Sequence, residues 1–235
     1  MVKTISAIIQ AREDSSRLPN KVLKKIINNE NSISLIIKRL NKSKYIKKII
    51  VAVPHESKKF DYLKKKFKNI ELFKGKKHNV LDRYYNAAFF FNITTIVRIT
   101  SDCPLIDYKL LDKMIKDFKK NKVNYYSNCI LRSFPDGYDI EIFDFKSLAF
   151  AHKNAKSLYD KEHVTSYLMK SKKIKKRNYT ISPNLYFLRC TLDDINDLKF
   201  IRKIYRFFAP KIYFGYEDFK KLFYKKPNFF ITKWH

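Results

Sequence analysis

The chain has 235 residues, with 51 Lys and Arg against 22 Asp and Glu and a formal net charge of +29. Its three cysteines, Cys103, Cys129 and Cys190, lie apart without metal-ligand spacing, which excludes a disulfide scaffold and indicates a reducing cytoplasm. No apolar stretch reaches the length of a membrane span, and charge follows the N-terminal apolar run too soon for a signal peptide.

The positive charge allows two interpretations. A nucleic-acid or anionic-membrane surface would concentrate cations, and a nucleic-acid face would mix arginine and aromatic residues among them. Here lysine is spread along the whole chain, which is typical of a solvated surface. We therefore expect no specific nucleic-acid partner, and a role close to a membrane stays open.

In the first half of the chain, apolar runs alternate with amphipathic stretches, which predicts βαβ units around a mainly parallel sheet. Strands are expected at Ile5–Gln10, Ile49–Val53, Ile70–Phe73 and Thr95–Ile99. Helices are expected at Ser34–Leu40, Lys58–Phe67, Val80–Phe91 and Tyr108–Phe118.

After residues 124–128 the periodicity changes. Strands are expected at Tyr138–Phe143, Ile174–Tyr179 and Tyr186–Cys190, and helices at Phe145–Asn154, Lys161–Ser171, Ile195–Phe208 and Glu217–Phe223. Since no linker or repeat interrupts the chain, we expect one domain over residues 1–235 with an inserted subdomain at approximately 130–185.

The loop after the first strand carries several cations and hydroxyl groups. In an open α/β sheet, ligands bind at the carboxyl ends of the strands. Guanidinium and ammonium groups beside hydroxyls suit a triphosphate, because charge-assisted hydrogen bonds to phosphate are strong. The chain has no G-x-x-x-x-G-K-[ST] sequence, so the loop predicts a triphosphate site that is not a P-loop. A basic surface loop is the alternative.

This loop, Ala11-Arg12-Glu13-Asp14-Ser15-Ser16-Arg17-Leu18-Pro19-Asn20-Lys21, resembles the A-R-x-x-S-[ST]-R-L-P-x-K motif of the sugar nucleotidyltransferases that make CMP-activated acidic sugars. These include the CMP-KDO and CMP-sialic acid synthetases and the branch called spore coat polysaccharide biosynthesis protein F. Further matching segments follow in the family's order at residues 79–85, 97–107, 134–141, 162–165 and 191–194. The resemblance therefore covers nearly the whole chain.

The loop departs from the family pattern at two positions. The family usually has glycine where Asn20 stands, and a small residue or glycine where Asp14 stands. Asparagine tolerates the left-handed backbone conformation, so Asn20 can replace glycine. Glu13 and Asp14 are unfavourable beside a polyanion unless both point away from it or share a metal ion.

The resemblance implies a three-layer α/β fold of the nucleotide-diphospho-sugar transferase (glycosyltransferase-A-like) type. It implies a Mg²⁺-dependent cytidylyltransferase that transfers CMP from CTP to an acidic or related sugar, with release of pyrophosphate, for surface polysaccharide or glycoconjugate synthesis. It also implies a homodimer in which the inserted subdomain reaches over the partner's site.

The resemblance also assigns roles to individual residues. Those implied for nucleotide binding are Ala11, Arg12, Ser15, Arg17, Lys21, Arg83 and Arg98. Those implied for catalysis are Arg12, Arg17, Lys21, Asp102 and Asp193, with Asp102 and Asp193 as metal ligands. Those implied for sugar binding are Asp136, Asp139, Glu141, Glu162, His163 and Thr165.

Elementary chemistry supports these roles and leaves alternatives open. Mg²⁺ takes one or two carboxylates together with substrate phosphates and water, and Asp102 and Asp193 both follow predicted strands. Either aspartate could instead cap a turn or helix, as we expect of Asp107 and Asp194.

Three of the other assignments also have structural alternatives. His163 is suited to act as a general base but equally to a structural role. Glu141 could face solvent from an alternating strand, and Arg83 could form an ion pair within its helix.

Three other functions stay open. A glycosyltransferase of the same fold commonly carries an Asp-x-Asp motif, and Asp102-Cys103-Pro104 lacks its second carboxylate. A nucleotidyltransferase that uses another base is harder to separate from a cytidylyltransferase. A basic nucleic-acid-binding protein would show binding that weakens steeply with salt, and no pyrophosphate release.

Overall fold

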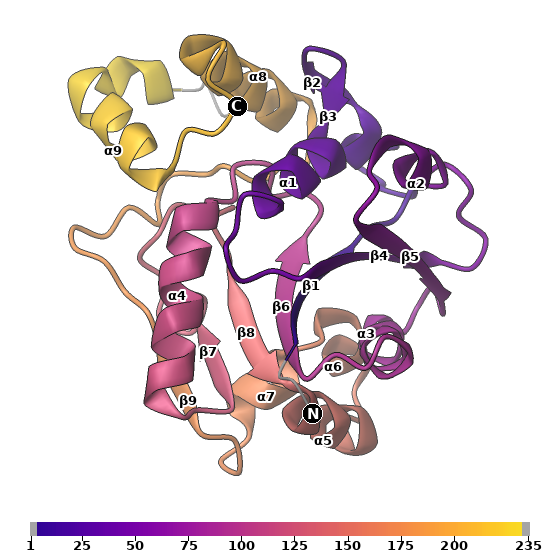
Figure 1. Ribbon diagram of the computed structural model, residues 1–235. Helices are drawn as coiled ribbons and strands as arrows, with labels where there is room; N and C mark the ends of the chain where they lie inside the picture. Colours follow the sequence, from indigo (N-terminus) through magenta and orange to yellow (C-terminus); the bar gives the residue numbers. More distant parts are fainter. Residues whose placement is uncertain (1–3, 232–235) are drawn as a thin grey trace.

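A seven-stranded sheet in the order β5-β4-β1-β6-β8-β7-β9 forms the centre of the computed structural model, which describes residues 4–231 (Figure 1). Its strands are β1 (Ile5–Gln10), β4 (Lys48–Pro54), β5 (Ile70–Gly75), β6 (Thr95–Thr100), β7 (Tyr125–Ser127), β8 (Glu141–Asp144) and β9 (Lys176–Asn178). Only β8 runs antiparallel to its neighbours within this sheet, so the expectation of a mainly parallel sheet is confirmed.

Helices cover both faces of the sheet. They are α1 (Ser32–Leu40), α2 (Tyr62–Lys66), α3 (Val80–Phe90), α4 (Tyr108–Asn121), α5 (Phe145–Asn154), α6 (Leu158–His163), α7 (Ser166–Lys170), α8 (Ile195–Phe208) and α9 (Tyr216–Lys225). A small hairpin of β2 (Lys25–Ile27) and β3 (Glu30–Asn31) and the 3-10 turns η1 (Lys21–Leu23) and η2 (Pro227–Phe230) complete the described chain.

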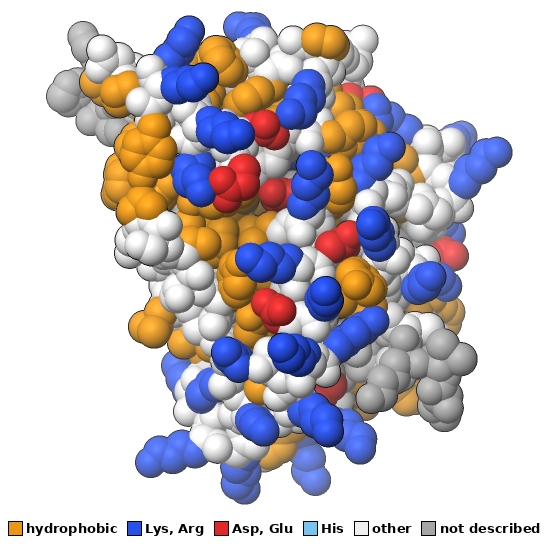
Figure 2. All heavy atoms as spheres, turned by 60° about the vertical axis from the view of Figure 1, so that its left-hand side comes forward, with side chains coloured by type: hydrophobic (Ala, Val, Ile, Leu, Met, Phe, Trp, Pro, Cys, Tyr) orange, Lys and Arg blue, Asp and Glu red, His pale blue; other side chains and the backbone are white. Residues whose placement is uncertain are grey.

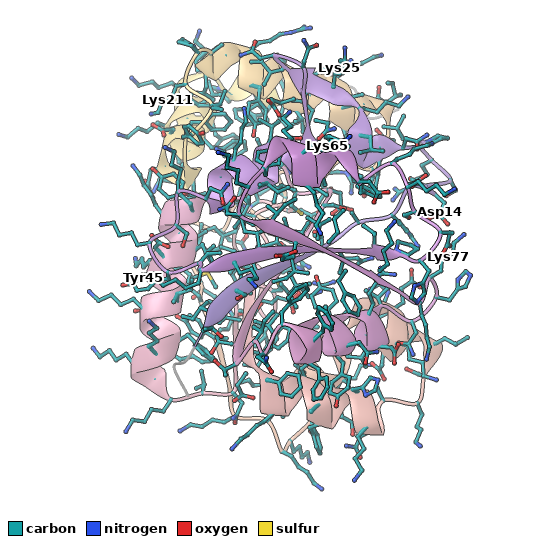
Figure 3. All side chains as sticks on the ribbon, turned by 45° about the vertical axis from the view of Figure 1, so that its right-hand side comes forward. Asp14, Lys25, Tyr45, Lys65, Lys77 and Lys211 are labelled. Carbon is teal, nitrogen blue, oxygen red and sulfur yellow. The ribbon has the colours of Figure 1, made fainter. Side chains whose placement is uncertain are left out.

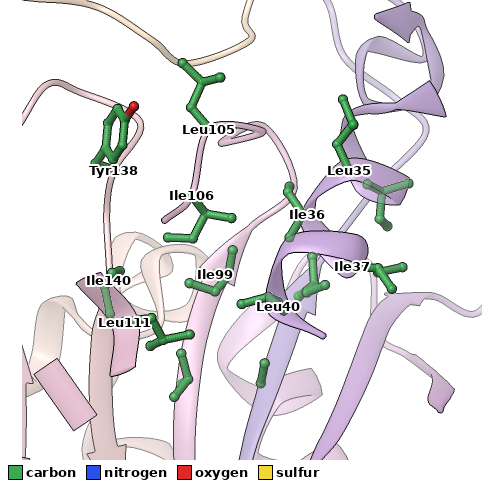
Figure 4. Close-up of a cluster of buried hydrophobic side chains, with 14 of the residues drawn as sticks. Leu35, Ile36, Ile37, Leu40, Ile99, Leu105, Ile106, Leu111, Tyr138 and Ile140 are labelled. Carbon is green, nitrogen blue, oxygen red and sulfur yellow. The ribbon is translucent and has the colours of Figure 1, made fainter. Parts of the chain in front are cut away.

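The alternation of side chains along the strands builds a core on each face. Ala7 and Ile9 of β1 point into a core shared with α1, α4, α8 and α9, whereas Ile8 points into a core under α3 and α5. Figure 4 shows part of the first core, where Ile36 and Leu40 of α1 lie close to Ile99 of β6. Burial on both faces explains why the central strands are almost continuously apolar.

Several expected elements differ from the structure. The helix expected at Lys58–Phe67 is only α2, and the one expected at Lys161–Ser171 is divided into α6 and α7. The division falls at Val164, which is fully buried and has a φ of 59°, a rare conformation for a β-branched residue. Packing of the Val164 side chain therefore outweighs the local preference to continue the helix.

The strand expected at Tyr186–Cys190 is wrong. Within that segment Arg189 forms an isolated bridge to Asp136. Tyr186 and Phe187 of the same segment are exposed and pair with no strand. The short elements β2, β3 and β7 were not expected from the sequence.

Residues 130–185, expected as an inserted subdomain, supply β8 and β9 to the central sheet and α5, α6 and α7 to one of its layers. Ile142 and Phe143 of this segment lie in the two cores of the sheet. None of the helices within residues 4–231 has the length and apolar character that crossing a membrane requires.

Candidate active site

Segments from both halves of the chain meet at the carboxyl edge of the parallel strands. The loop after β1 continues the sheet at Ala11, whose amide donates to the carbonyl oxygen of Ala52 at 3.1 Å. Asp102 follows β6, and its carbonyl oxygen accepts from the amide of Leu192 at 2.8 Å. This backbone bond places Asp193 beside Asp102, as expected for two carboxylates at one site.

Lys21 lies between these two carboxylates. Its Nζ is 2.9 Å from Asp102 Oδ2 and 2.7 Å from Asp193 Oδ1. Burial disfavours the charged amine, but the two carboxylates outweigh burial and raise the pKa of Lys21 above its ordinary value. Burial likewise opposes ionisation of Asp193, yet the hydrogen bonds from Lys21 and Arg189 lower the pKa of this carboxyl. The contact between Lys21 and Asp193 therefore favours the charged forms of both groups.

Two arginines extend this cluster. Arg17, which is largely exposed, has its Nη2 3.1 Å from Asp193 Oδ1. Arg189 donates to the other oxygen of Asp193 at 2.6 Å and to both carboxylate oxygens of buried Asp197 at 3.1 Å. Arg189 was not predicted from the sequence. The one feature that could have indicated it is its position four residues before Asp193.

The position of Arg189 is fixed by a turn of the neighbouring segment. The amide of Cys190 donates to the carbonyl oxygen of Asp136 at 2.7 Å. Gly137 has a φ of +108°, and a Cβ there would lie 2.7 Å from the carbonyl carbon of Cys190. Glycine is therefore required at this turn by both conformation and space.

The first loop accommodates both departures from the family pattern. Asn20 has φ 55° and ψ 31°, so its expected left-handed conformation is confirmed. Glu13 accepts hydrogen bonds from the amides of Lys58 and Lys59 at 3.1 Å, and Asp14 lies 2.9 Å from Lys77 Nζ (Figure 3). Both carboxylates thus bind a neighbouring loop or lysine, and neither pairs with Arg12, Arg17 or Lys21 of its own loop.

Other nucleotide candidates have varied surroundings. Arg12 is half exposed and lies 3.7 Å from Glu162, a sugar candidate, and Ser15 is partly buried in the same loop. Arg83 is buried and donates to the carbonyl oxygen of Lys76 at 2.7 Å, so the ion pair within its helix is not formed. Its Nε is buried without a hydrogen-bond partner within the described chain, and burial lowers the pKa of its guanidinium.

Arg98 and Glu141 contact each other across the paired strands β6 and β8. They form an ion pair, and Tyr125 donates a hydrogen bond to the second oxygen of Glu141. Glu141 is only 3% exposed, so the alternative that it faces solvent is wrong. Burial opposes the charge on Arg98, but Glu141 outweighs it and raises the pKa of the guanidinium.

The remaining sugar candidates fall into two groups. Asp139 accepts from Arg132 through both oxygens at 3.0 Å, while Asp136 lies 3.6 Å from the same arginine. Burial raises the pKa of Asp139 despite the opposing effect of Arg132. On the α6 side, the His163 ring packs on Tyr159 with centroids 4.2 Å apart.

Thr165 is buried beside the end of α6, and its hydroxyl donates to the carbonyl oxygen of His163 at 3.3 Å.

The donor set fits a magnesium ion bound together with a nucleotide. Asp102 and Asp193 share one cation, the amine of Lys21, and therefore converge on one point. Within residues 4–231 there is no group of three or more His, Cys, Asp or Glu side chains that could hold a metal. Two carboxylates suffice for Mg²⁺ because substrate phosphates and water complete its coordination.

The expected caps are confirmed. Asp107 accepts from the amide of Lys109 at 2.8 Å, and Asp194 accepts from the amides of Asn196 and Asp197 at the start of α8. Asp194 therefore caps α8, whereas the neighbouring Asp193 pairs through its carboxylate with Lys21, Arg17 and Arg189.

Cations that suit phosphate, facing a carboxylate pair at the carboxyl edge of a mainly parallel sheet, are the arrangement of a nucleotidyltransferase. The family comparison identifies the chain more closely. The cytidylyltransferase family model matches residues 6–225, so the chain belongs to the cytidylyltransferase family.

Similar proteins agree with this family. An uncharacterized protein of Methanocaldococcus jannaschii, MJ1063, is 38% identical over 213 residues, which cover 87% of this chain and 84% of the relative. The spore coat polysaccharide biosynthesis protein SpsF of Bacillus subtilis is 26% identical over 209 residues, which cover 85% of each.

Solved structures show the same fold. A cytidylyltransferase from Leptospira borgpetersenii has a TM-score of 0.90 at 30% identity, with 99% of both chains covered. A CMP:2-keto-3-deoxy-manno-octonic acid synthetase complexed with CTP has a TM-score of 0.65 at 13% identity, covering 86% of this chain and 98% of that one. This second likeness extends the nucleotide-sugar transferase fold to more distant sequences.

Proposed function

We propose that the protein transfers CMP from CTP to an acidic or related sugar, with release of pyrophosphate and with Mg²⁺ as cofactor. The observation that carries the proposal is the convergence of Asp102 and Asp193 on Lys21, next to the cationic loop of Arg12 and Arg17. Family membership supports CTP as the nucleotide.

In this proposal the loop after β1 binds the β- and γ-phosphates. Arg17 and Lys21 both contact Asp193, and we expect them to exchange this carboxylate for phosphate oxygens when CTP binds. They then stabilise the negative charge that develops on the departing pyrophosphate. Arg12, with its side chain half exposed, is available for the same purpose.

Asp102 and Asp193 would hold the magnesium ion, which when bound polarises the α-phosphate toward attack. Lys21 neutralises charge on both carboxylates and would turn toward the phosphates of CTP, so nucleotide and metal binding are expected to be coupled. Arg189 keeps Asp193 oriented through its bond to the oxygen that does not face Lys21.

The acceptor sugar is proposed to bind between Asp136, Asp139, Glu162 and the start of α7. Asp136 and Arg132 offer partly exposed acceptors and donors, and Asp136 lies 3.9 Å from Arg189, the arginine that binds Asp193. The name of the SpsF relative supports a role in polysaccharide biosynthesis. We further propose a homodimer and a cytoplasmic location; the free cysteines Cys103, Cys129 and Cys190 support the latter.

Pyrophosphate release from CTP, UTP, GTP and ATP, each with and without Mg²⁺ and with a panel of acidic and neutral sugars, tests this function. Release with CTP, Mg²⁺ and one sugar supports the proposal. Pyrophosphate release with another nucleotide would still indicate a nucleotidyltransferase, but one with a donor other than CTP. Transfer from a nucleotide sugar, without pyrophosphate, would instead establish a glycosyltransferase.

A further inference from the structure

A cleft of about 950 Å³ opens at the amino ends of the parallel strands, away from the candidate active site. It is lined by the beginnings of β1 and β6, the ends of α3 and α4 and the start of α5. Six residues of β6 separate this edge from the carboxyl edge, a span of about 20 Å at 3.3 Å per residue. The cleft is therefore separate from the nucleotide and sugar regions.

The interior of the cleft is apolar. Phe89, Phe118 and Phe145 line it together with Ile93 and Val123. At its border, the end of α3 exposes Phe89 by 63% and Phe90 by 69%. Exposed aromatic side chains next to an apolar hollow are typical of an interaction site.

Lysines surround this apolar interior. Lys119, Lys122 and Lys146 are exposed, line the cleft and form no ion pair with a carboxylate of residues 4–231. The carboxylate of Asp144 also lines it, but its oxygens accept from the Asn124 side chain and the Ser147 amide.

Further lysines lie along the same edge. Lys47 binds the carbonyl oxygen of Ile5 through its amide, and Lys48 Nζ lies 5.0 Å from the Phe91 ring centroid. Figure 2 shows Lys and Arg side chains over the whole visible face, including its lower part. Part of the positive charge of the chain thus lies at this edge.

We propose that this edge docks the protein on an anionic phospholipid membrane. Lysines near an anionic surface attract lipid headgroups, while exposed aromatic residues enter the boundary between headgroups and acyl chains. A second copy of the chain fits this edge less well, because two rims of unpaired lysines would face each other. Docking through this edge leaves the candidate active site open to water at the opposite, carboxyl edge of the sheet.

Binding of the full-length protein to vesicles tests the proposal. Co-sedimentation compares phosphatidylcholine vesicles with vesicles that also contain phosphatidylglycerol. The test variant is Lys119→Gln/Lys122→Gln/Lys146→Gln, and the charge-matched control is Lys58→Gln/Lys65→Gln/Lys68→Gln around α2. These control lysines are exposed and lie outside the cleft.

The wild type and the control are expected to bind anionic vesicles alike and to bind phosphatidylcholine weakly. The test variant should bind anionic vesicles about a hundredfold more weakly, since each lysine contributes about fivefold. Phe89→Ser should reduce the binding that remains at high salt, where electrostatic attraction is screened.

The proposal would be overturned by no binding of the wild type to anionic vesicles, by equal losses in the test and control variants, or by a change of oligomeric state in the test variant alone. The last would assign the cleft to a second copy. Displacement of the protein from vesicles by a stoichiometric amount of short RNA would also overturn it, in favour of a nucleic-acid surface. None of these readouts depends on nucleotidyl transfer.

Discussion

The amine of Lys21 lies 2.7 Å from Oδ1 of Asp193, a residue 172 positions further along the chain. The same amine contacts Asp102, so one lysine neutralises both carboxylates that we assign to the metal. An internal cation in this place competes with any external one.

Replacing Lys21 should therefore separate metal binding from nucleotide binding. Lys21→Met removes the cation shared by both carboxylates, so that Asp102 loses its lysine and Asp193 keeps only Arg17 and Arg189. Calorimetry should show Mn²⁺ binding to the nucleotide-free protein about tenfold more tightly, since a unit charge at this range contributes about 1 to 4 kcal/mol. The KM for CTP should rise in the same variant because a phosphate ligand is lost.

The control is Lys24→Met, at an exposed position beyond the site. Lys24→Met should change neither the affinity for Mn²⁺ nor the KM for CTP. Unaltered Mn²⁺ affinity in Lys21→Met would show that the lysine does not compete with the metal.

Asp102→Asn and Asp193→Asn should each lower kcat by about 10³-fold, because each removes a proposed ligand of the ion that stabilises the transition state. The fold should survive, since an amide has nearly the shape of a carboxylate. Steady-state pyrophosphate release and thermal unfolding check both points. Full activity of Asp102→Asn would refute the metal assignment.

Asp194→Ala is the matched control for Asp193. This substitution removes the cap of α8 and should cost about 1 kcal/mol of stability. The expected fall in Tm is about 2–4 °C, with little change in kcat. If Asp194→Ala lost activity but kept its stability, Asp194 would be the residue of the active site and Asp193 would have the structural role.

The ion pair of Arg98 and Glu141 should behave as a unit. Glu141→Gln leaves a buried guanidinium without its carboxylate and should destabilise the protein by about 3–5 kcal/mol. In urea unfolding, the double variant Arg98→Met/Glu141→Gln should lose clearly less than the sum of the single variants. Additive losses would mean that the contact is not formed.

The same double variant also tests the role of Glu141 toward the sugar. If its stability recovers while the KM for the sugar stays high, Glu141 contacts the acceptor. If the stability and the KM for the sugar recover together, Glu141 acts only by stabilising the fold.

Glu30 should make stability depend on acid pH. Burial opposes its ionisation, but hydrogen bonds from Lys38 and Lys66 outweigh burial and lower the pKa of Glu30 below its ordinary 4.5. Because the folded-state pKa is the lower one, the stabilisation is complete above pH 4.5 and disappears as pH falls through the folded value.

Glu30→Gln should therefore lose about 1–2 kcal/mol at pH 7 relative to the wild type, and almost nothing near pH 2. Urea unfolding across this range measures the difference. Glu71→Gln, at an exposed pair 3.7 Å from Lys64, should lose little at any pH. A loss in Glu30→Gln that did not depend on pH would exclude the ion pairs as its cause.

The sequence predicted the first half of the sheet well because strands such as β1 and β4 are buried on both faces and are apolar nearly throughout. It failed at short elements such as β7, where three residues are held by partners far along the chain. The left-handed Asn20 was predictable since its cause is local. Long-range packing instead set the break at Val164.

The candidate site shows the same contrast. Motif order identified Lys21, Asp102 and Asp193, but the bridge between them depends on how three distant segments meet. Arg189 was not predicted, because its contact with buried Asp197 forms only through the fold and leaves no pattern in the sequence. Local sequence therefore indicated the chemistry of the site, and tertiary contacts determined its charge balance.

The cluster of Lys21, Asp102 and Asp193 draws on residues from near both ends of the chain. During synthesis from the N-terminus, the loop after β1 appears early, but the site lacks its second carboxylate until Asp193 emerges. A nascent chain consequently cannot complete the site before the segment that precedes α8 is made. We therefore expect a nucleotide to protect from proteolysis only a chain that contains Asp193. Shorter products of interrupted translation should not be protected.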